Sequence, residues 1–201
     1  MTSNQGIEHG DTYNYILETA IPLFAAQGFS GVSMRDISKA VGVSTAALYH
    51  HFSDKENLYL EVMRHAFTDK AVAISTTLEI KGTPLQRLEH FINSFVILIE
   101  SDPNFRALVQ WELLDGDETR LKLLTEEVFV GPFQAIISLV EELTTDSDPH
   151  MLAVSIIGLV LFHFEMAPMR HFLPGGRPEH NDSKYIAKHV MQFLTKGLSP
   201  S

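Results

Sequence analysis

The stretch from Ser33 to Lys55 constrains the fold of this chain more than any other part of its sequence. It reads SMRDISKAVGVSTAALYHHFSDK, and apolar residues recur at helical spacing on both sides of a break at Gly42. Ser33 and Ser44 stand where a hydroxyl caps a helix, and Gly42 stands where a helix end needs a left-handed residue. The pattern predicts a helix-turn-helix, a motif whose second helix enters the major groove of DNA.

Helical signals flank this motif on both sides. Before it, Asp11 is a plausible cap and Gly28 a stop, and Pro22 predicts a kink between them. After it, Ser53 and Glu56 have the spacing of a capping box that would open the next helix. The motif is therefore expected to lie between two longer helices.

The rest of the chain is also predicted to be helical, because no run alternates with a period of two. The expected fold class is all-α with about nine helices. Gly131 and Pro132 predict a break inside one of them. Besides the two helices of the motif, the predicted helices cover residues 12–27, 54–77, 84–100, 105–114, 118–143, 149–166 and 183–196.

The N-terminal third resembles the DNA-binding domain of TetR-family (TetR/AcrR-type) transcriptional regulators. The ending LYHHF-SDKENL is far more specific than a generic helix-turn-helix. The matching residues are Ala20, Leu23, Phe24, Gly28, Phe29, the runs 32–37, 40–44 and 48–52, Lys55 and Leu58. Residues 1–10 are polar and without periodicity, so a disordered tail is expected there. The resemblance implies a DNA-binding domain over 11–70 with its motif at 33–52, and a C-terminal ligand-binding and dimerisation domain over 71–201.

The resemblance also implies roles for individual side chains. Tyr49 and Lys55 match positions that usually hold phosphate, and Arg35, Thr45 and His50 match positions that can reach bases. The alternative for Tyr49 and His50 is an ordinary exposed helix face. The complete set of predicted DNA-binding residues is Ser33, Arg35, Ser44, Thr45, Ala46, Ala47, Tyr49, His50, His51 and Lys55.

The charge balance is unusual for a DNA-binding protein. The chain has 15 basic and 25 acidic residues, a net charge of −10, and residues 1–70 hold five basic and eight acidic ones. No Lys or Arg precedes Arg35, so the basic arm that TetR-like proteins often carry is missing. DNA contact is expected to depend on few side chains and on helix N-termini, with low non-specific affinity and a modest salt dependence.

Aromatic and semi-polar side chains gather in the C-terminal two thirds. By the resemblance, the central helices there enclose a small-molecule pocket, and such a lining suggests a largely apolar ligand. The alternative is that these residues are plain core of a helical bundle. The predicted pocket residues are His90, Phe91, Asn93, Phe95, Phe105, Gln110, Trp111, Phe129, Phe133 and His163.

The two last long helices resemble the pair through which the family dimerises across a two-fold axis. Small residues in the first of them would allow a close approach between helices. An internal buried helix fits the same apolar pattern equally well. The predicted interface residues are Ala153, Ile157, Gly158, Leu161, Tyr185, Ile186, Val190 and Phe193.

Several other functions are disfavoured. There is no cysteine, no nucleophile beside an ordered base and no phosphate-binding loop, so an enzyme is not expected. The ten histidines include no His-x3-His pair with a carboxylate, so neither a metal nor another cofactor is expected. The N-terminus lacks the pattern of a signal peptide, and the apolar run around Met151–Phe164 is too short to span a membrane.

The sequence therefore predicts a cytoplasmic homodimer that binds a palindromic DNA operator and is released from it by a small, largely apolar effector. Its partners would be double-stranded DNA, the effector and a second copy of itself. The alternative is a helical dimer that binds a ligand or protein and has little affinity for DNA. The acidic balance and the missing basic arm favour that alternative.

Overall fold

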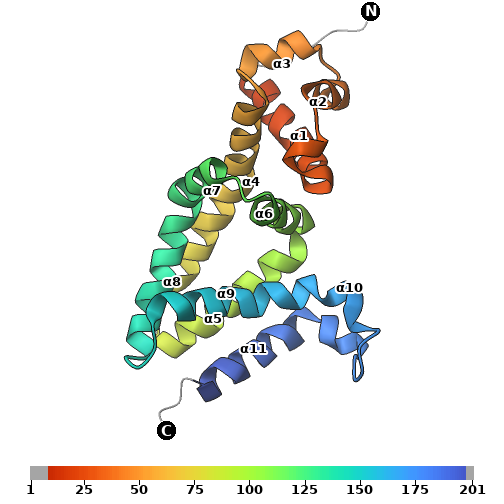
Figure 1. The fold of residues 1–201 in the computed structure, drawn as a ribbon. Coiled ribbons are helices and arrows are strands. Elements are labelled where there is room, and N and C mark those ends of the chain that lie inside the picture. Colours follow the sequence, from red (N-terminus) through yellow and green to blue (C-terminus); the bar gives the residue numbers. More distant parts are fainter. Residues whose placement is uncertain (1–8, 198–201) are drawn as a thin grey trace, which may run out of the picture. The chain divides into compact units, whose positions relative to one another are not determined.

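The computed structural model describes residues 9–197, and these residues form helices and no strand (Figure 1). The predicted all-α class is confirmed. Eleven α-helices replace the expected nine within this range, because the segment 118–143 is divided and a short helix follows α9. They are α1 (His9–Gly31), α2 (Met34–Val41), α3 (Thr45–His51), α4 (Lys55–Leu78), α5 (Pro84–Ser101), α6 (Pro103–Asp115), α7 (Glu118–Leu124), α8 (Val130–Leu143), α9 (Pro149–Glu165), α10 (Ala167–Arg170) and α11 (Ser183–Gly197).

The chain divides into two compact units. The first holds the described residues up to Thr68 together with Asn104–Glu127, and the second holds Asp69–Pro103 and the described residues from Val128 on. Residues 104–127 therefore pack with the helix-turn-helix, although the sequence places them in a C-terminal domain. Of the tail predicted over residues 1–10, the first eight lie outside the described residues, and α1 already begins at His9.

Helix α1 is interrupted at Gly28, the residue predicted to stop it. Gly28 has φ 67° and ψ 178°, which are non-helical angles in the left-handed half of the map. Pro22 lies inside α1, but the non-helical angles are recorded at Gly28 and not at the proline. The change of direction thus comes from the glycine, which adopts a positive φ without steric cost.

The caps of the helix-turn-helix follow the sequence closely. Ser33 accepts a hydrogen bond from the Asp36 amide, and the Asp36 carboxylate accepts one from the Ser33 amide at 3.0 Å, so the two residues form a capping box. Gly42 closes α2 with φ 82°. Ser44 accepts from the Ala47 amide at 3.1 Å and so caps α3. These predictions are confirmed.

The predicted cap of the following helix is wrong. Asp54, and not Ser53, accepts the Asn57 amide, at 2.8 Å, and α4 begins at the next residue, Lys55. The Ser53 hydroxyl donates to the Asp54 carboxylate at 3.0 Å and thereby orients it. Glu56 does not complete a capping box with Ser53. The Asp54 carboxylate, and not the neighbouring Ser53 hydroxyl, caps α4 because it accepts more hydrogen bonds and carries a charge that suits a helix N-terminus.

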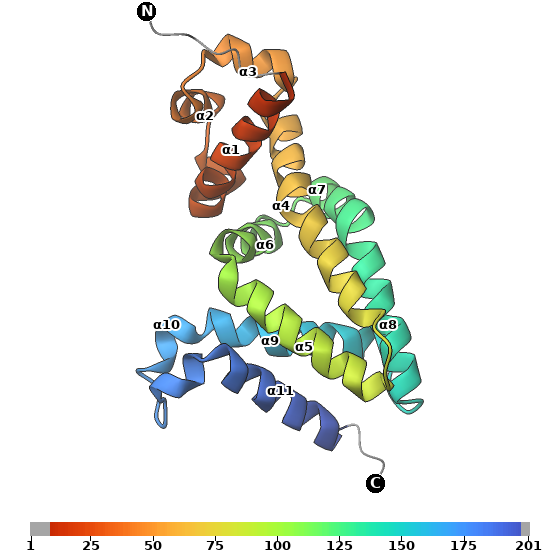
Figure 2. The same ribbon diagram turned by 180° about the vertical axis from the view of Figure 1, so that it is seen from behind.

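The second unit is built on α5, α8, α9 and α11. Helix α5 packs against α8, α9 and α11, and α9 packs in turn against α8 and α11. Figure 2 shows α11 beside α5 and α9 from behind. Thr83 accepts the Gln86 amide and Pro84 occupies the first helical position, as the sequence predicts for the start of α5.

The helical segment 118–143 is interrupted one turn before Gly131 and Pro132, where the break was predicted. Residues Thr125–Phe129 form a π-helical turn between α7 and α8, and Gly131 and Pro132 are both inside α8. Proline disturbs the turn that precedes it, since its ring clashes with the carbonyl four residues before and it has no amide to donate. The wider π turn removes that clash without ending the helical rod.

Candidate nucleic-acid interface

Helix α3 presents one outward face, as predicted. Tyr49 is 52% exposed, and Ala46 and His50 are also exposed. Leu48 and Phe52 are buried and fix the opposite face against the rest of the first unit. A face with small residues and one tyrosine can lie close to a DNA groove and can donate a hydroxyl to a phosphate.

Thr45 contributes to packing as well as to that face. It is half-buried, and its hydroxyl lies 3.1 Å from the Ser38 hydroxyl on α2. The single Ser38 proton goes to the Arg35 carbonyl at 3.0 Å, so Thr45 is the donor toward Ser38. The bond joins α2 to α3 and uses the Thr45 proton, so toward a base Thr45 could act only as an acceptor.

Exposed charge on the motif is sparse. Arg35 and Lys39 are exposed cations on α2. The Ser33 hydroxyl and amide lower the pKa of Asp36, and the Asn57 amide and the Ser53 hydroxyl lower the pKa of Asp54. Both carboxylates therefore stay ionised as helix caps, and they offset much of the positive charge of the motif.

Lys55, predicted to hold phosphate, has its ammonium 4.2 Å from the centroid of the Phe29 ring. It is half-buried, at the first position of α4. Burial lowers its pKa, and the charge of Arg120 lowers it further. The sequence gives no sign of this aromatic contact, because Phe29 is 26 residues away in the chain.

His51, which the sequence placed among the DNA-binding residues, packs toward α1. It is half-buried, with its ring 6.4 Å from that of Tyr13. Tyr13 stacks on Phe52 at 5.0 Å. Burial and a hydrogen bond to Glu61 raise the pKa of Tyr13 to about 12. The remaining predicted residues are Ser33 and Ser44, which are exposed and serve as caps, and Ala47, which is half-buried.

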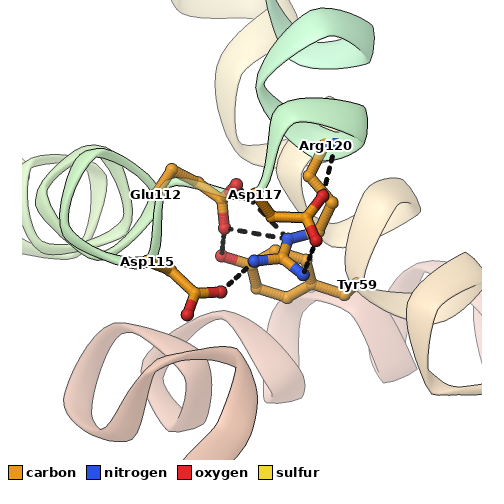
Figure 3. Close-up of polar contacts among 5 residues, drawn as sticks. All are labelled: Tyr59, Glu112, Asp115, Asp117 and Arg120. Carbon is orange, nitrogen blue, oxygen red and sulfur yellow. Dashed lines mark hydrogen bonds and ion pairs between the residues drawn. The ribbon is translucent and has the colours of Figure 1, made fainter.

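A polar cluster formed by Tyr59, Glu112, Asp115, Asp117 and Arg120 could not be foreseen from the sequence (Figure 3). We name it the buried polar cluster after Tyr59, Glu112 and Arg120, which are buried, while the two aspartates reach solvent. Tyr59 donates its hydroxyl to Glu112 Oε1 at 2.7 Å, and burial and this bond raise the pKa of Tyr59. Glu112 is 2% and Arg120 4% exposed. Arg120 Nε lies 3.4 Å from both carboxylate oxygens of Glu112.

Two aspartates complete this polar cluster from the turn between α6 and α7. Asp115 pairs with Arg120 Nη2, and Asp117 Oδ2 lies 3.5 Å from Arg120 Nη1. Asp117 also accepts the Arg120 amide at 2.9 Å and so caps α7. The only sign of this cluster in the sequence was Glu112, a glutamate at an inward position of α6. Helical periodicity shows that the position faces inward but does not show which residue pairs with it.

The ten predicted pocket residues are divided between the two units. Phe105, Gln110 and Trp111 belong to the first unit, and the other seven belong to the second. Phe105 packs on Phe67 at 4.7 Å, and Trp111 Nε1 donates to the Ala25 carbonyl at 3.0 Å.

The seven predicted pocket residues of the second unit differ in exposure. His90 and Asn93 are exposed on α5, while Phe91 and Phe95 are buried and stack at 5.5 Å. Phe129, Phe133 and His163 are half-buried. The burial of Phe91 and Phe95 fits the alternative interpretation as core, and the pocket itself stays a prediction.

Three of the predicted interface residues are internal. Ala153 and Val190 are fully buried and Ile186 nearly so, which means that most of their surface packs inside the protomer. The apolar pattern of α9 could not show which of its sides faces inward, and the interface itself stays a prediction. Ile157 and Leu161 are half-buried, and Gly158, Tyr185 and Phe193 are exposed.

A groove runs along the outer side of α9 and α11. It is lined by Ser155, Gly158, Leu159, Phe162, His163, His189, Val190 and Phe193. Phe162 is 64% and Phe193 59% exposed. We define the outer apolar face as the exposed residues Met151, Val154, Gly158, Phe162 and Phe193.

A metal site and a membrane-spanning helix were also considered. No group of three metal-ligating side chains is found in the part of the chain that the structure describes. The segment Glu118–Leu143 is long and apolar enough to cross a membrane by length and composition. The core helix of a soluble protein passes the same test, and this segment contains Arg120 with its ion pairs and the π turn, so the likeness carries little weight.

Comparison with known proteins gives consistent results. Residues 16–62 match the family described as "Bacterial regulatory proteins, tetR family". The chain is 26% identical over 186 residues to the HTH-type transcriptional activator FasR of Mycolicibacterium smegmatis, covering 92% of this chain and 81% of that one. It is 29% identical over 149 residues to the HTH-type transcriptional repressor DhaR of Mycobacterium sp. strain GP1, covering 71% and 75%.

The fold is also similar to solved structures. The transcriptional regulator FadR of Bacillus subtilis, in complex with stearoyl-CoA, superposes with a TM-score of 0.75 at 18% identity. The match covers 92% of this chain and 98% of that one. At this identity the likeness shows the fold alone. The relatives named above are transcriptional regulators and not enzymes.

Proposed function

The chain is a TetR-family regulator of transcription, and from this premise we propose that it binds a palindromic DNA operator as a homodimer and represses transcription until a small effector releases it. The premise rests on the matched residues 16–62 and on relatives that are named as regulators. The relatives include an activator and a repressor, so the direction of control is part of the proposal.

The observation that carries the proposal is the outward face of α3. Three cap interactions, at Ser33, Gly42 and Ser44, set the length and direction of α2 and α3. They leave Tyr49 and His50 exposed on a helix short enough to lie in a major groove. Two copies of this face, related by a two-fold axis, would meet DNA about one helical turn apart, roughly 34–36 Å.

The predicted effector is a small, largely apolar molecule, and an acyl-CoA is the class to test first. FadR of Bacillus subtilis, which shares the fold, is described as a complex with stearoyl-CoA. An effector that binds better to a DNA-incompetent arrangement weakens DNA binding by its difference in affinity between the two arrangements. Stearoyl-CoA is therefore the first probe, with free coenzyme A as its control.

The second candidate is a helical dimer with little affinity for DNA, which the charge of the motif favours. The capping carboxylates Asp36 and Asp54 are ionised, and Lys55 rests on an aromatic ring. No Lys or Arg precedes Arg35 in the sequence. Such a protein would dimerise and bind a ligand in the cytoplasm without enriching any DNA sequence.

Selection from a library of randomised DNA duplexes at low salt separates the two candidates. Enrichment of a palindromic site supports the regulator, and a stable dimer that enriches no sequence supports the second candidate. The selected duplex then serves as the operator in measurements of affinity.

Tyr49→Ala is expected to weaken binding to the selected duplex by about tenfold or more, because a hydrogen bond to a charged phosphate is lost in each half-site. Tyr15→Ala makes the same chemical change at a similarly exposed position of α1 and is the matched control. Equal affinities of wild type and Tyr49→Ala, measured by fluorescence anisotropy, would remove Tyr49 from the interface.

A further inference from the structure

Two cations share one aromatic ring in the first unit. Lys55 Nζ lies 4.2 Å and Arg120 Cζ 4.5 Å from the centroid of the Phe29 ring. The face of an aromatic ring attracts cations, but the two charges repel each other. Arg120 is also among the causes that lower the pKa of Lys55. The position of Lys55 is therefore sensitive both to the ring and to the guanidinium.

Arg120 cannot move away from Lys55, because the buried polar cluster holds it. It is 4% exposed and pairs with Glu112, Asp115 and Asp117. Removing a buried charge from several carboxylates is costly. Lys55, in contrast, is half-buried at the first position of a helix and has a flexible stem.

The three carboxylates would otherwise attract Lys55. Arg120 occupies them, and its own charge opposes entry of a second cation. We propose that Phe29 and Arg120 are positioning residues for Lys55, the ring by holding its ammonium and the guanidinium by keeping it from the carboxylates of Glu112, Asp115 and Asp117. This assignment rests on the proposed function, in which Lys55 contacts a DNA phosphate.

Holding Lys55 before DNA arrives reduces the entropy that the contact would otherwise lose. Immobilising one side chain with many rotamers weakens binding by about two- to tenfold per site, so prior immobilisation recovers a factor of this size in each half-site. A cation resting on a ring keeps its outer side accessible, and a phosphate can approach from there.

The first test compares Phe29→Leu with Lys55→Ala on the duplex selected by wild type. Lys55→Ala removes one phosphate contact per protomer, so the slope of log K against log salt becomes shallower by about 1.8 for the dimer. Phe29→Leu is expected to weaken binding by about two- to tenfold per half-site and to leave the slope close to that of wild type, because the phosphate contact still forms but loses more side-chain entropy. Phe29→Tyr retains the ring and should restore the affinity.

Controls separate positioning from stability. Phe24 packs edge-on against Tyr59 at 4.7 Å, as Phe29 does at 5.1 Å, so Phe24→Leu removes a ring from the same tyrosine without touching Lys55. Its affinity for the duplex should equal that of wild type. The double variant Phe29→Leu with Lys55→Ala should bind within about twofold of Lys55→Ala alone, because both changes act on one contact.

A second pair of variants tests the guanidinium. Arg120→Gln leaves the carboxylates of the buried polar cluster without their cation, and Lys55 is expected to turn toward them, which makes the salt slope shallower as in Lys55→Ala. Arg64 is an exposed arginine of α4 that pairs with Glu61 and Glu127. Arg64→Gln makes the same change in charge and should leave the slope unchanged.

Nuclear magnetic resonance without DNA keeps this test independent of the proposed function. In wild type the ε-methylene protons of Lys55 should resonate upfield, because they lie over the Phe29 ring, and the shift should vanish in Phe29→Leu. Absence of the shift in wild type overturns the assignment. So does a Phe29→Leu affinity equal to that of wild type while Lys55→Ala binds more weakly. Failure to select any duplex, with the upfield shift present, counts against the proposed function alone.

Discussion

At the scale of single residues, Gly28 shows how one backbone position joins two distant parts of the first unit. Its φ of 67° interrupts α1, and a Cβ placed there would lie 2.9 Å from Trp111 Cδ2. The Trp111 indole is held in this place by its hydrogen bond to the Ala25 carbonyl. Only glycine satisfies both the dihedral angle and the close approach of the ring.

Gly28→Ala is therefore expected to destabilise the protein more than the same change at Gly42. Gly42 has φ 82°, but a Cβ added at this position would meet nothing within 4 Å, so alanine there incurs only the left-handed strain of about 1–2 kcal/mol. At Gly28, overpacking against Trp111 adds about 1–3 kcal/mol. Urea unfolding followed by circular dichroism measures both. Equal losses of stability for the two variants would show that Trp111 moves aside freely.

Residue-level features that act over three or four positions were predictable. The Ser33 capping box, the Gly42 turn and the Ser44 cap depend only on hydrogen bonds inside one helix turn. The residue types at these positions are therefore enough to predict them. Where two caps were adjacent in the sequence, at Ser53 and Asp54, the spacing alone chose the wrong one.

At the scale of elements, α9 and α11 meet at a pair of histidines. The rings of His163 and His189 lie 5.5 Å apart and nearly perpendicular. Burial lowers the pKa of His163, and the charges of His189 and Arg170 lower it further. Arg170 is fixed between elements, because its guanidinium donates to the carbonyls of His163 and His180.

The depressed pKa of His163 predicts a loss of stability in mild acid. Between its folded pKa and its ordinary value of about 6.5, the unfolded chain binds more protons than the folded one. The stabilisation is thus present above about pH 6.5 and is lost as the pH falls through the folded pKa. His163→Gln should reduce the pH dependence of the urea midpoint between about pH 7 and pH 5. The exposed His65, changed to Gln, is the control, and an unchanged pH dependence in His163→Gln would refute the prediction.

At the scale of the whole molecule, the outer apolar face of α9 and α11 is what a second copy would cover. Phe162 and Phe193 are both more than half exposed, and a Cβ added at Gly158 would meet nothing within 4 Å of its own protomer. The face thus has two aromatic anchors beside a place where another helix could approach closely. Apolar faces of this kind mark interfaces between proteins.

If the proposed homodimer forms through this face, Phe162→Glu combined with Phe193→Glu should convert it to a monomer, because four buried carboxylates without partners would face each other across the two-fold axis. Leu114, which is 78% exposed on α6, provides the control: Leu114→Glu should leave the dimer intact. Sedimentation equilibrium measures the mass of each variant. A dimer that persists in the double variant would place the interface elsewhere.

The all-α class and the helix-turn-helix with its caps could be predicted from the sequence alone. Both depend on residues close together in the chain, whose hydrogen bonds and helical spacing follow from local geometry. Only the tertiary structure decided which side of α9 is buried, since Ala153 is internal while Val154 is exposed and both fit the same apolar pattern. It alone also brought Lys55 onto Phe29 and Arg120 into the buried polar cluster. Contacts between residues far apart in the chain are selected by packing and by the need to pair every buried charge. The spacing of residues within a single segment does not predict either of them.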